Sequence, residues 1–237
     1  MYYYISGWIK YYQWDGSQWI YMGLVPGDIN SVSFMSLTPF VTYDGQKLYY
    51  SREVGSGNYK IYVATWDGSG FNNSVPLGSQ INNPYGYNPS LTQDMQKLYY
   101  QKNSGGYIYE STWNGSDWGS PIQLPPEVNA GGSRTYPKIT PDGNELYFSG
   151  AGIWYRYLAF SRKIGGVWQQ WQYCDYNINP PGSTEYVSSP TFTYNTYENQ
   201  KLYFMRSLTT TSYFYAFRSP TSVQPASIGQ IKASYAR

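Results

Sequence analysis

A four-residue block recurs along the chain, and this internal repeat limits the possible folds more than any other feature. Each copy contains Leu-Tyr followed by a second aromatic residue, and the copies begin at Lys47, Lys97, Glu145 and Lys201. Successive copies are 50, 48 and 56 residues apart. Units of this length usually bury their apolar faces only against neighbouring units. The repeat therefore predicts several similar units packed side by side.

Each repeat carries signals for more than one strand. A proline precedes the block, and an Asp-containing turn such as Tyr43-Asp44-Gly45-Gln46 lies between them. A second aromatic block follows, as in Ile61 to Trp66, and the hairpin glycine Gly68 separates it from another aromatic residue. Asp-Gly and Asn-Gly pairs favour tight hairpin turns because these turns need positive φ. No stretch has helical periodicity, so the pattern predicts four antiparallel strands per repeat.

We therefore predict an all-β fold, a five-bladed β-propeller with four-stranded antiparallel blades in a single domain. Tyr2-Tyr3-Tyr4 is expected at the Leu-Tyr-Tyr place of the first blade, and Gln230 to Ala236 is expected to supply its inner strand. Pairing of the two terminal segments would close the ring and leave no open sheet edge. The expected blades are residues 1–30 with 230–236, 31–82, 83–129, 130–179 and 180–229.

Composition narrows the function classes. The formal net charge is only +2, which is too small to indicate a nucleic-acid partner. The chain has no histidine and a single cysteine, Cys174, so Ser-His-Asp and Cys-His catalysis and the commonest zinc ligand are excluded. No spacing matches a calcium loop, and no apolar stretch reaches the length of a transmembrane helix. We expect no metal, no cofactor and no membrane span.

The expected inner strands lack the groups that most glycosidases use. Glycoside hydrolysis usually requires two carboxylates that face one another across the substrate. Residues 36–42, 88–92, 136–140 and 188–193 contain neither Asp nor Glu. Glu53 and Glu185 could reach a central cleft from loops, but nothing pairs them. We therefore expect that the chain is not an enzyme, with a five-bladed glycoside hydrolase as the alternative.

Candidate binding residues are expected on the face that carries the loops from each outer strand to the next inner strand. One set recurs with the repeat: Asn30, Asn82, Asn129 and Asn179. Their amides could cap loop backbone, or they could form a ring of donors and acceptors for a polar ligand such as a sugar. Asp44, Asp94 and Asp142 are expected on the opposite face, where Asp stabilises turns through local hydrogen bonds.

A second set of polar and aromatic residues on the loop face breaks the repeat. Because the fold alone does not require them, they are our further candidates for ligand contacts. They are Arg52, Glu53, Tyr59, Lys102, Tyr107, Arg134, Trp154 and Glu185.

The run from Pro137 to Ser149, PKITPDGNELYFS, resembles the WD40-like, TolB-type propeller repeat called PD40. The segment from Leu158 to Asn179 resembles it as well, and the resemblance extends from Tyr2 to about Ser222. Met95, in place of a glycine, and a three-residue insertion before Lys201 depart from the pattern. The family implies a propeller that is secreted or lies in the bacterial envelope, and it implies no catalytic residue.

The resemblance also implies contacts with proteins or glycans more often than chemistry. We therefore expect a non-catalytic binding module that recognises carbohydrate or another polar ligand through the loop face and the channel mouth. A protein–protein interaction scaffold is the alternative within the same fold.

Overall fold

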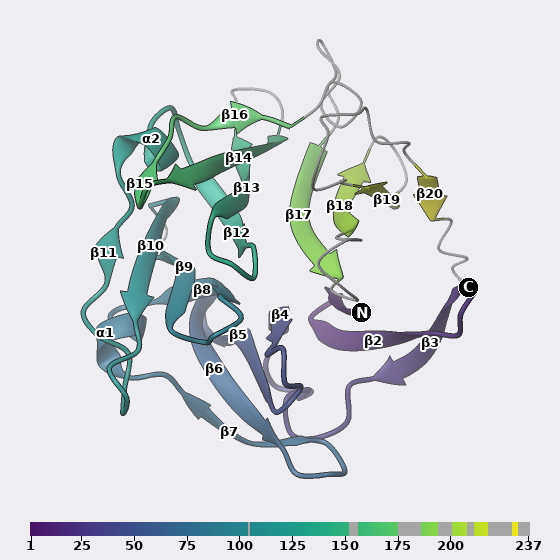
Figure 1. Ribbon diagram of the computed structural model, residues 1–237. Coiled ribbons are helices and arrows are strands. Elements are labelled where there is room, and N and C mark those ends of the chain that lie inside the picture. The colour runs from purple at the N-terminus through teal and green to yellow at the C-terminus, as the bar shows by residue number, and fades with distance from the viewer. Residues whose placement is uncertain are drawn as a thin grey trace.

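The sheets of the computed structural model are arranged around a common axis, as a propeller requires (Figure 1). The structure describes residues 1–103, 105–151, 156–174, 186–193, 201–207, 211–217 and 229–231. The first sheet contains β1 (Tyr2–Ile5), β2 (Trp8–Trp14) and β3 (Trp19–Leu24). The second contains β4 (Ser36–Val41), β5 (Lys47–Gly55), β6 (Asn58–Trp66) and β7 (Phe71–Pro76). The third contains β8 (Gly86–Leu91), β9 (Lys97–Lys102), β10 (Tyr107–Thr112) and β11 (Ile122–Gln123).

The remaining strands form one larger sheet. Its first part comprises β12 (Arg134–Ile139), β13 (Glu145–Ala151), β14 (Arg156–Ile164), β15 (Val167–Trp168) and β16 (Gln172–Tyr173). Its second part comprises β17 (Tyr186–Thr193), β18 (Lys201–Ser207), β19 (Thr211–Phe217) and β20 (Gly229–Ile231). Two single-turn helices, α1 (Ser79–Asn82) and α2 (Pro126–Asn129), precede β8 and β12.

The structure confirms an all-β propeller with antiparallel four-stranded sheets, but the predicted number of blades was wrong. Hydrogen bonds join the described strands into four sheets, of which one has nine strands. This large sheet arises because a parallel contact between Arg156 and Tyr186 links β14 to β17. A repeat pattern cannot predict such a contact, because it joins two units at their edges.

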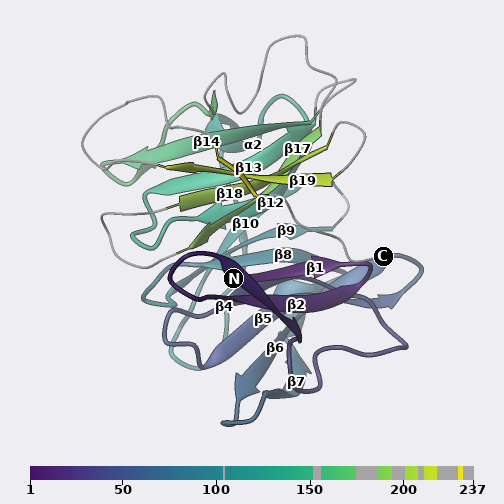
Figure 2. The ribbon, with the colours of Figure 1, turned by 90° about the vertical axis from the view of Figure 1, so that its right-hand side faces the viewer.

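The predicted closure of the ring is not seen in the described residues. Gln230 and Ile231 belong to β20, which pairs with β19 and not with the first sheet. Residues 232–236 lie outside the described part of the chain. Among the described strands β1 pairs with β2 alone, and it lies beside β4 (Figure 2). The first sheet therefore has three described strands.

The register of the first sheet also corrects a prediction. Ile9 lies opposite Tyr4, whereas its counterpart Ile61 lies opposite Ser51, the residue after Leu48-Tyr49-Tyr50. Tyr2-Tyr3-Tyr4 is therefore shifted by one position from the expected Leu-Tyr-Tyr place. Hydrophobic spacing did not reveal this shift, because tyrosine can lie on either face of a strand.

The apolar core lies between neighbouring sheets. Residues that recur with the repeat, such as Leu48, Leu98 and Leu146, are fully buried. One cluster joins Phe40 of β4 to Leu91 of β8 and includes the ring of Trp113 at its edge. Burial of one such large side chain stabilises a fold by about 1.5–3 kcal/mol. In the described part of the chain, each core cluster thus combines side chains from two adjoining sheets.

The inner strands share a bulge that begins next to a proline. Thr38, Asn88 and Tyr136 each precede a proline and have φ values of 50°, 56° and 53°. The strand register shifts at these places in β4, β8 and β12. A bulge bends a strand and redirects the side chains that follow it. The residue after each proline therefore takes a position that a regular strand would not give it.

A recurring asparagine makes the same backbone contacts in three of the described units. The Asn82 Oδ1 accepts a hydrogen bond from the Ile61 N–H at 2.8 Å, and its Nδ2 donates to the Ile61 and Leu77 carbonyls at 2.9 Å. Asn30 makes the same three contacts with Ile9 and Val25, and Asn129 makes them with Ile108 and Leu124. We call this arrangement the asparagine clamp. It ties the loop before an inner strand to the preceding unit.

Replacement of the Asn82 clamp is expected to destabilise the protein. Asn82→Ala removes the side-chain partner of the Ile61 N–H and of the Leu77 carbonyl, while the Ile61 carbonyl keeps its bond from the Leu77 N–H; we expect a loss of about 2–4 kcal/mol of unfolding free energy. Urea unfolding monitored by tryptophan fluorescence measures the loss. Gln172→Ala, an exposed amide on β16, is the control and should change stability by less than about 0.5 kcal/mol. Equal stability of Asn82→Ala and the wild type would contradict the role of the clamp.

Candidate functional site

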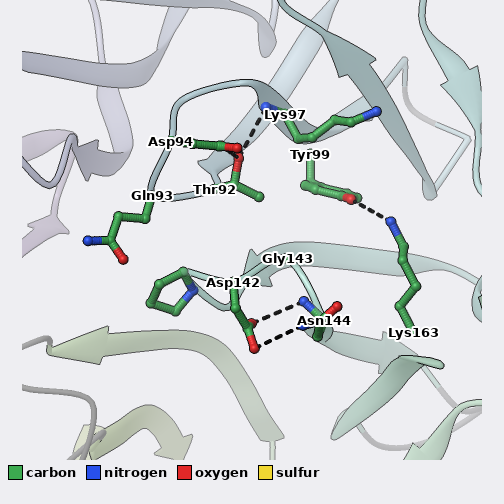
Figure 3. A pocket seen from close by; sticks show the side chains of 10 residues that line it. Thr92, Gln93, Asp94, Lys97, Tyr99, Asp142, Gly143, Asn144 and Lys163 are labelled. Atoms are coloured by element: carbon green, nitrogen blue, oxygen red, sulfur yellow. Dashed lines mark hydrogen bonds between the residues drawn. The ribbon is translucent and has the colours of Figure 1, made fainter. Parts of the chain in front are cut away.

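A polar pocket of about 490 Å³ lies between two strand-joining turns (Figure 3). One turn connects β8 to β9, and the other connects β12 to β13. The Gln93 N–H donates to the Pro141 carbonyl at 2.9 Å, so the two turns are tied directly to each other. The lining comprises Thr92, Gln93, Asp94, Lys97, Tyr99, Pro141, Asp142, Gly143, Asn144 and Lys163. This pocket lies at the turns, on the face that sequence analysis assigned to structure and not to binding.

The two aspartates of the pocket have the structural role predicted for them. The Thr92 hydroxyl donates to Asp94 Oδ1 at 2.6 Å, and the Gln96 N–H donates to the same oxygen at 3.0 Å. Thr140, Asp142 and Asn144 repeat this arrangement in the next unit. Burial acts to raise the pKa of Asp142, but hydrogen bonds from Thr140 and Asn144 outweigh it and hold the pKa below its usual value. Asp142 is therefore ionised at neutral pH.

One side of the pocket is formed by a network of two lysines around a single carboxylate. Glu110 Oε1 lies 2.6 Å from Lys97 Nζ, and Glu110 Oε2 lies 3.6 Å from Lys163 Nζ. Tyr99 donates its hydroxyl to Glu110 Oε2 at 2.6 Å and accepts a hydrogen bond from Lys163 Nζ at 3.2 Å. Burial and the Glu110 charge raise the pKa of Tyr99, so this hydroxyl stays protonated. Two ammonium groups share one carboxylate, which leaves this wall of the pocket positively charged.

The structure places three of the predicted asparagines in the asparagine clamp. Asn30, Asn82 and Asn129 each use both amide hydrogens and one carbonyl lone pair for backbone contacts. Their geometry matches the capping interpretation, and they have little capacity left for a ligand. Asn179 lies outside the described residues.

Three cations of the repeat-breaking set donate hydrogen bonds to backbone carbonyls in the segments that precede inner strands. Arg52 donates to the Asp28 carbonyl at 2.9 Å, and Lys102 Nζ donates to the Gln80 carbonyl at 3.2 Å. Arg134 is fully buried, donates to the Val128 carbonyl at 3.1 Å and lies 4.6 Å from the Trp171 ring. The fold therefore uses these side chains, contrary to the expectation that it does not require them.

The other described members of the set lie near the ends of β5, β6 and β10. The Tyr59 ring contacts the Tyr87 ring at a centroid distance of 5.8 Å, and Glu53 accepts a hydrogen bond from the Gly57 N–H. Burial, followed by the charge of Glu53, raises the pKa of Tyr59. Tyr107 is 43% exposed. Trp154 and Glu185 lie outside the described residues.

Lys138, which follows the bulge of β12, was not among the binding residues predicted from the sequence. The side chain is nine-tenths buried, and its Nζ lies 4.8 Å from the centroid of the Phe40 ring on β4. Burial lowers the pKa of Lys138 to about 8. The only signal in the sequence is that Lys138 occupies the place of Phe40 and Ser90, immediately after the inner-strand proline. A charged residue at that recurring place distinguishes this unit from the others.

A metal-binding cluster and a membrane-spanning helix are both absent from the described part of the chain. No three His, Cys, Asp or Glu side chains gather there as a metal site would require. No helix within the described ranges has the length and apolar character needed to cross a membrane.

Comparison with solved structures finds several proteins with a fold similar to that of this chain. The structure is similar to putative TolB from Agrobacterium tumefaciens, with a TM-score of 0.58, 14% identity, and coverage of 96% of this chain and 74% of that chain. The chain spans 46% of a second TolB, from Acinetobacter baumannii. A structure of the nidogen/laminin complex matches with a TM-score of 0.55, 8% identity, and coverage of 91% of this chain and 84% of that chain. No family model and no curated protein matches the sequence.

A further similarity corrects the expectation that the chain is not an enzyme. A gluconolactonase from Xanthomonas campestris matches with a TM-score of 0.54 and 13% identity, over 89% of this chain and 65% of that chain. Likeness at this identity establishes the fold alone. It also shows that this fold supports catalysis, so a missing histidine and missing inner-strand carboxylates are not grounds to exclude an enzyme. Asp94 and Asp142 reach the pocket from turns, which the search of the inner strands did not cover.

Burial of Lys138 is expected to make stability depend on pH. Its folded-state pKa is about 8, below the value of about 10.4 for a lysine in an unfolded chain. Between these values the unfolded state binds more protons, so this contribution to stability is smallest below pH 8 and increases as the pH rises. Relative to Lys138→Met, the wild type should gain on the order of 2 kcal/mol of unfolding free energy from pH 8 to pH 10. Urea unfolding of both proteins across this range measures the difference, and parallel stability curves would contradict it.

Proposed function

We propose that this chain binds a polar ligand of the carbohydrate class in the pocket between the β8–β9 and β12–β13 turns. The observation that carries the proposal is the composition of the lining, which brings amide, carboxylate, ammonium and hydroxyl groups to one cavity of about 490 Å³. Sugar hydroxyls both donate and accept hydrogen bonds, so a mixed lining of this kind suits them. The volume falls within the range usual for small-molecule sites.

Several lining groups keep hydrogen-bonding capacity for a ligand. Asp94 uses Oδ1 for both of its turn contacts, and no hydrogen bond within the described residues uses its Oδ2. The exposed Gln93 side chain extends from the β8–β9 turn, as Figure 3 shows, and no hydrogen bond within the described residues occupies its amide. Lys163 presents its ammonium group beside the Tyr99 hydroxyl. These groups come from two neighbouring units, so the pocket requires their packing.

Gln93→Ala is expected to weaken sugar binding at least about fivefold without loss of stability, because it removes one ligand contact and no described side-chain hydrogen bond. A glycan array would identify the sugar, and isothermal titration calorimetry would measure its affinity. Gln46→Ala is the control, since Gln46 is an exposed amide in the corresponding turn of the second sheet. The proposal fails if the array shows no binding, or if both variants bind like the wild type.

A hydrolase-like activity is the second candidate, and the pair of carboxylates at the pocket favours it. Asp94 and Asp142 come from different units and line the same cavity. Two carboxylates that flank a substrate are the usual requirement for glycoside hydrolysis. The likeness to the gluconolactonase adds lactones to the substrates worth testing.

Activity against glycoside and lactone panels would test this candidate. If the pair is catalytic, Asp94→Asn and Asp142→Asn should each reduce turnover by at least about a hundredfold, since each removes an ionisable group of the reaction. Asp44→Asn, in the equivalent turn of the second sheet, is the control and should retain activity. Absence of turnover in the wild type, or full turnover in both variants, would eliminate a hydrolase that uses these residues.

Further features of the molecule are part of the same proposal. We also propose that the repeat is a divergent PD40-type repeat of a bacterial envelope or secreted protein, supported by the likeness to TolB propellers. The loop-face residues Glu53, Tyr59 and Tyr107 stay predicted ligand contacts. A protein-interaction scaffold stays the alternative, with the nidogen/laminin structure as its support.

A further inference from the structure

Lys138 lies on β12, the first strand of its sheet. Its strand β12 packs against β8, and β8 packs against β4 (Figure 1). The Lys138 ammonium nevertheless lies over the Phe40 ring of β4, at 4.8 Å from its centroid. The contact therefore joins side chains from two sheets, those of β4 and β12, that are not consecutive along the chain.

No anion neutralises this charge within the described residues. Lys138 Nζ has no ion pair or hydrogen bond there, and the Phe40 ring is its one recorded electrostatic neighbour. The lysines of the turn pocket differ in this respect, since Lys97 and Lys163 both contact Glu110. Lys138 is also absent from the pocket lining. It is therefore a cationic centre separate from the pocket.

An unpaired, buried ammonium group is unfavourable for folding. Proteins normally pair buried charges or replace them with apolar residues, because loss of hydration is not compensated by a single aromatic contact. The equivalent places in the second and third sheets hold Phe40 and Ser90, so the fold accepts uncharged residues there. A residue that costs stability at a place where the fold does not need it suggests a role in binding.

We propose that Lys138 is a binding site for the carboxylate group of a small organic acid. A single ammonium group can bind one carboxylate. The aromatic ring beside it can contact the apolar or sugar-like part of the same ligand. Phosphate and sulfate dianions usually require several converging donors or a bidentate arginine, and the described residues around Nζ supply neither. The carboxylate would supply the counter-charge that the chain lacks, and the Phe40 ring would contact the body of the ligand.

Thermal unfolding with small carboxylates tests the site. Acetate, propionate and glucuronate are titrated to about 50 mM against sodium chloride of equal ionic strength, with glucose as the neutral counterpart of glucuronate. We expect at least one carboxylate to raise the melting temperature of the wild type in a saturable way, since a ligand that binds only the native state stabilises it. Lys138→Met should weaken this binding at least about tenfold, because it removes the charged partner.

Two further variants separate the site from general charge effects. Lys47→Met removes an exposed lysine, and its response to each carboxylate should equal that of the wild type. Lys138→Arg keeps a cation and should retain part of the response, which a purely structural role would not predict. Equal shifts in the wild type and Lys138→Met, or no carboxylate shift beyond that of chloride, would overturn the proposal. Glucose tests sugar binding in the turn pocket, and acetate, which contains no sugar, tests Lys138. A negative result for one site can therefore be distinguished from a negative result for the other.

Discussion

Each sheet of this protein completes its apolar core only against the next sheet, and the other features depend on that packing. Fully buried leucines recur at the same place in successive repeats, and aromatic rings fill the space between the sheets. Since charged residues make up only 13% of the chain and aromatic residues 20%, tyrosine and tryptophan carry much of both burial and polar contact. The arrangement around an axis follows, because a sheet that needs a neighbour on each side is best satisfied in a ring.

The polar residues that recur with the repeat mainly satisfy backbone groups. The asparagine clamp gives three contacts to backbone in each of three units, and the Thr-x-Asp turns orient the chain between the first two strands of a unit. In a similar way, backbone carbonyls accept hydrogen bonds from the side chains of Arg52, Lys102 and Arg134. A buried backbone carbonyl without a partner is costly, so loops that join sheets recruit such side chains.

The two proposed binding sites lie where neighbouring units meet, or where the residue in one unit differs from the residues at the same place in the others. The turn pocket combines groups from two units, and its two lysines share a single carboxylate. Lys138 replaces the uncharged residues found at the equivalent places, and its charge lies over an aromatic ring from a different sheet. Both features depend on packing between sheets, and neither is complete within one repeat.

The sequence by itself determined the all-β repeat unit, since turn residues, strand length and aromatic spacing are local properties. It also identified the Asp-containing turns and the recurring asparagines, whose hydrogen bonds join segments within a unit and its adjoining loop. Only the tertiary structure decided the four-sheet hydrogen-bonding pattern, the one-residue shift in the first sheet, the pocket at the turns and the position of Lys138. These depend on which side chains from separate units come together, and that depends on packing between units, which a repeat pattern does not encode.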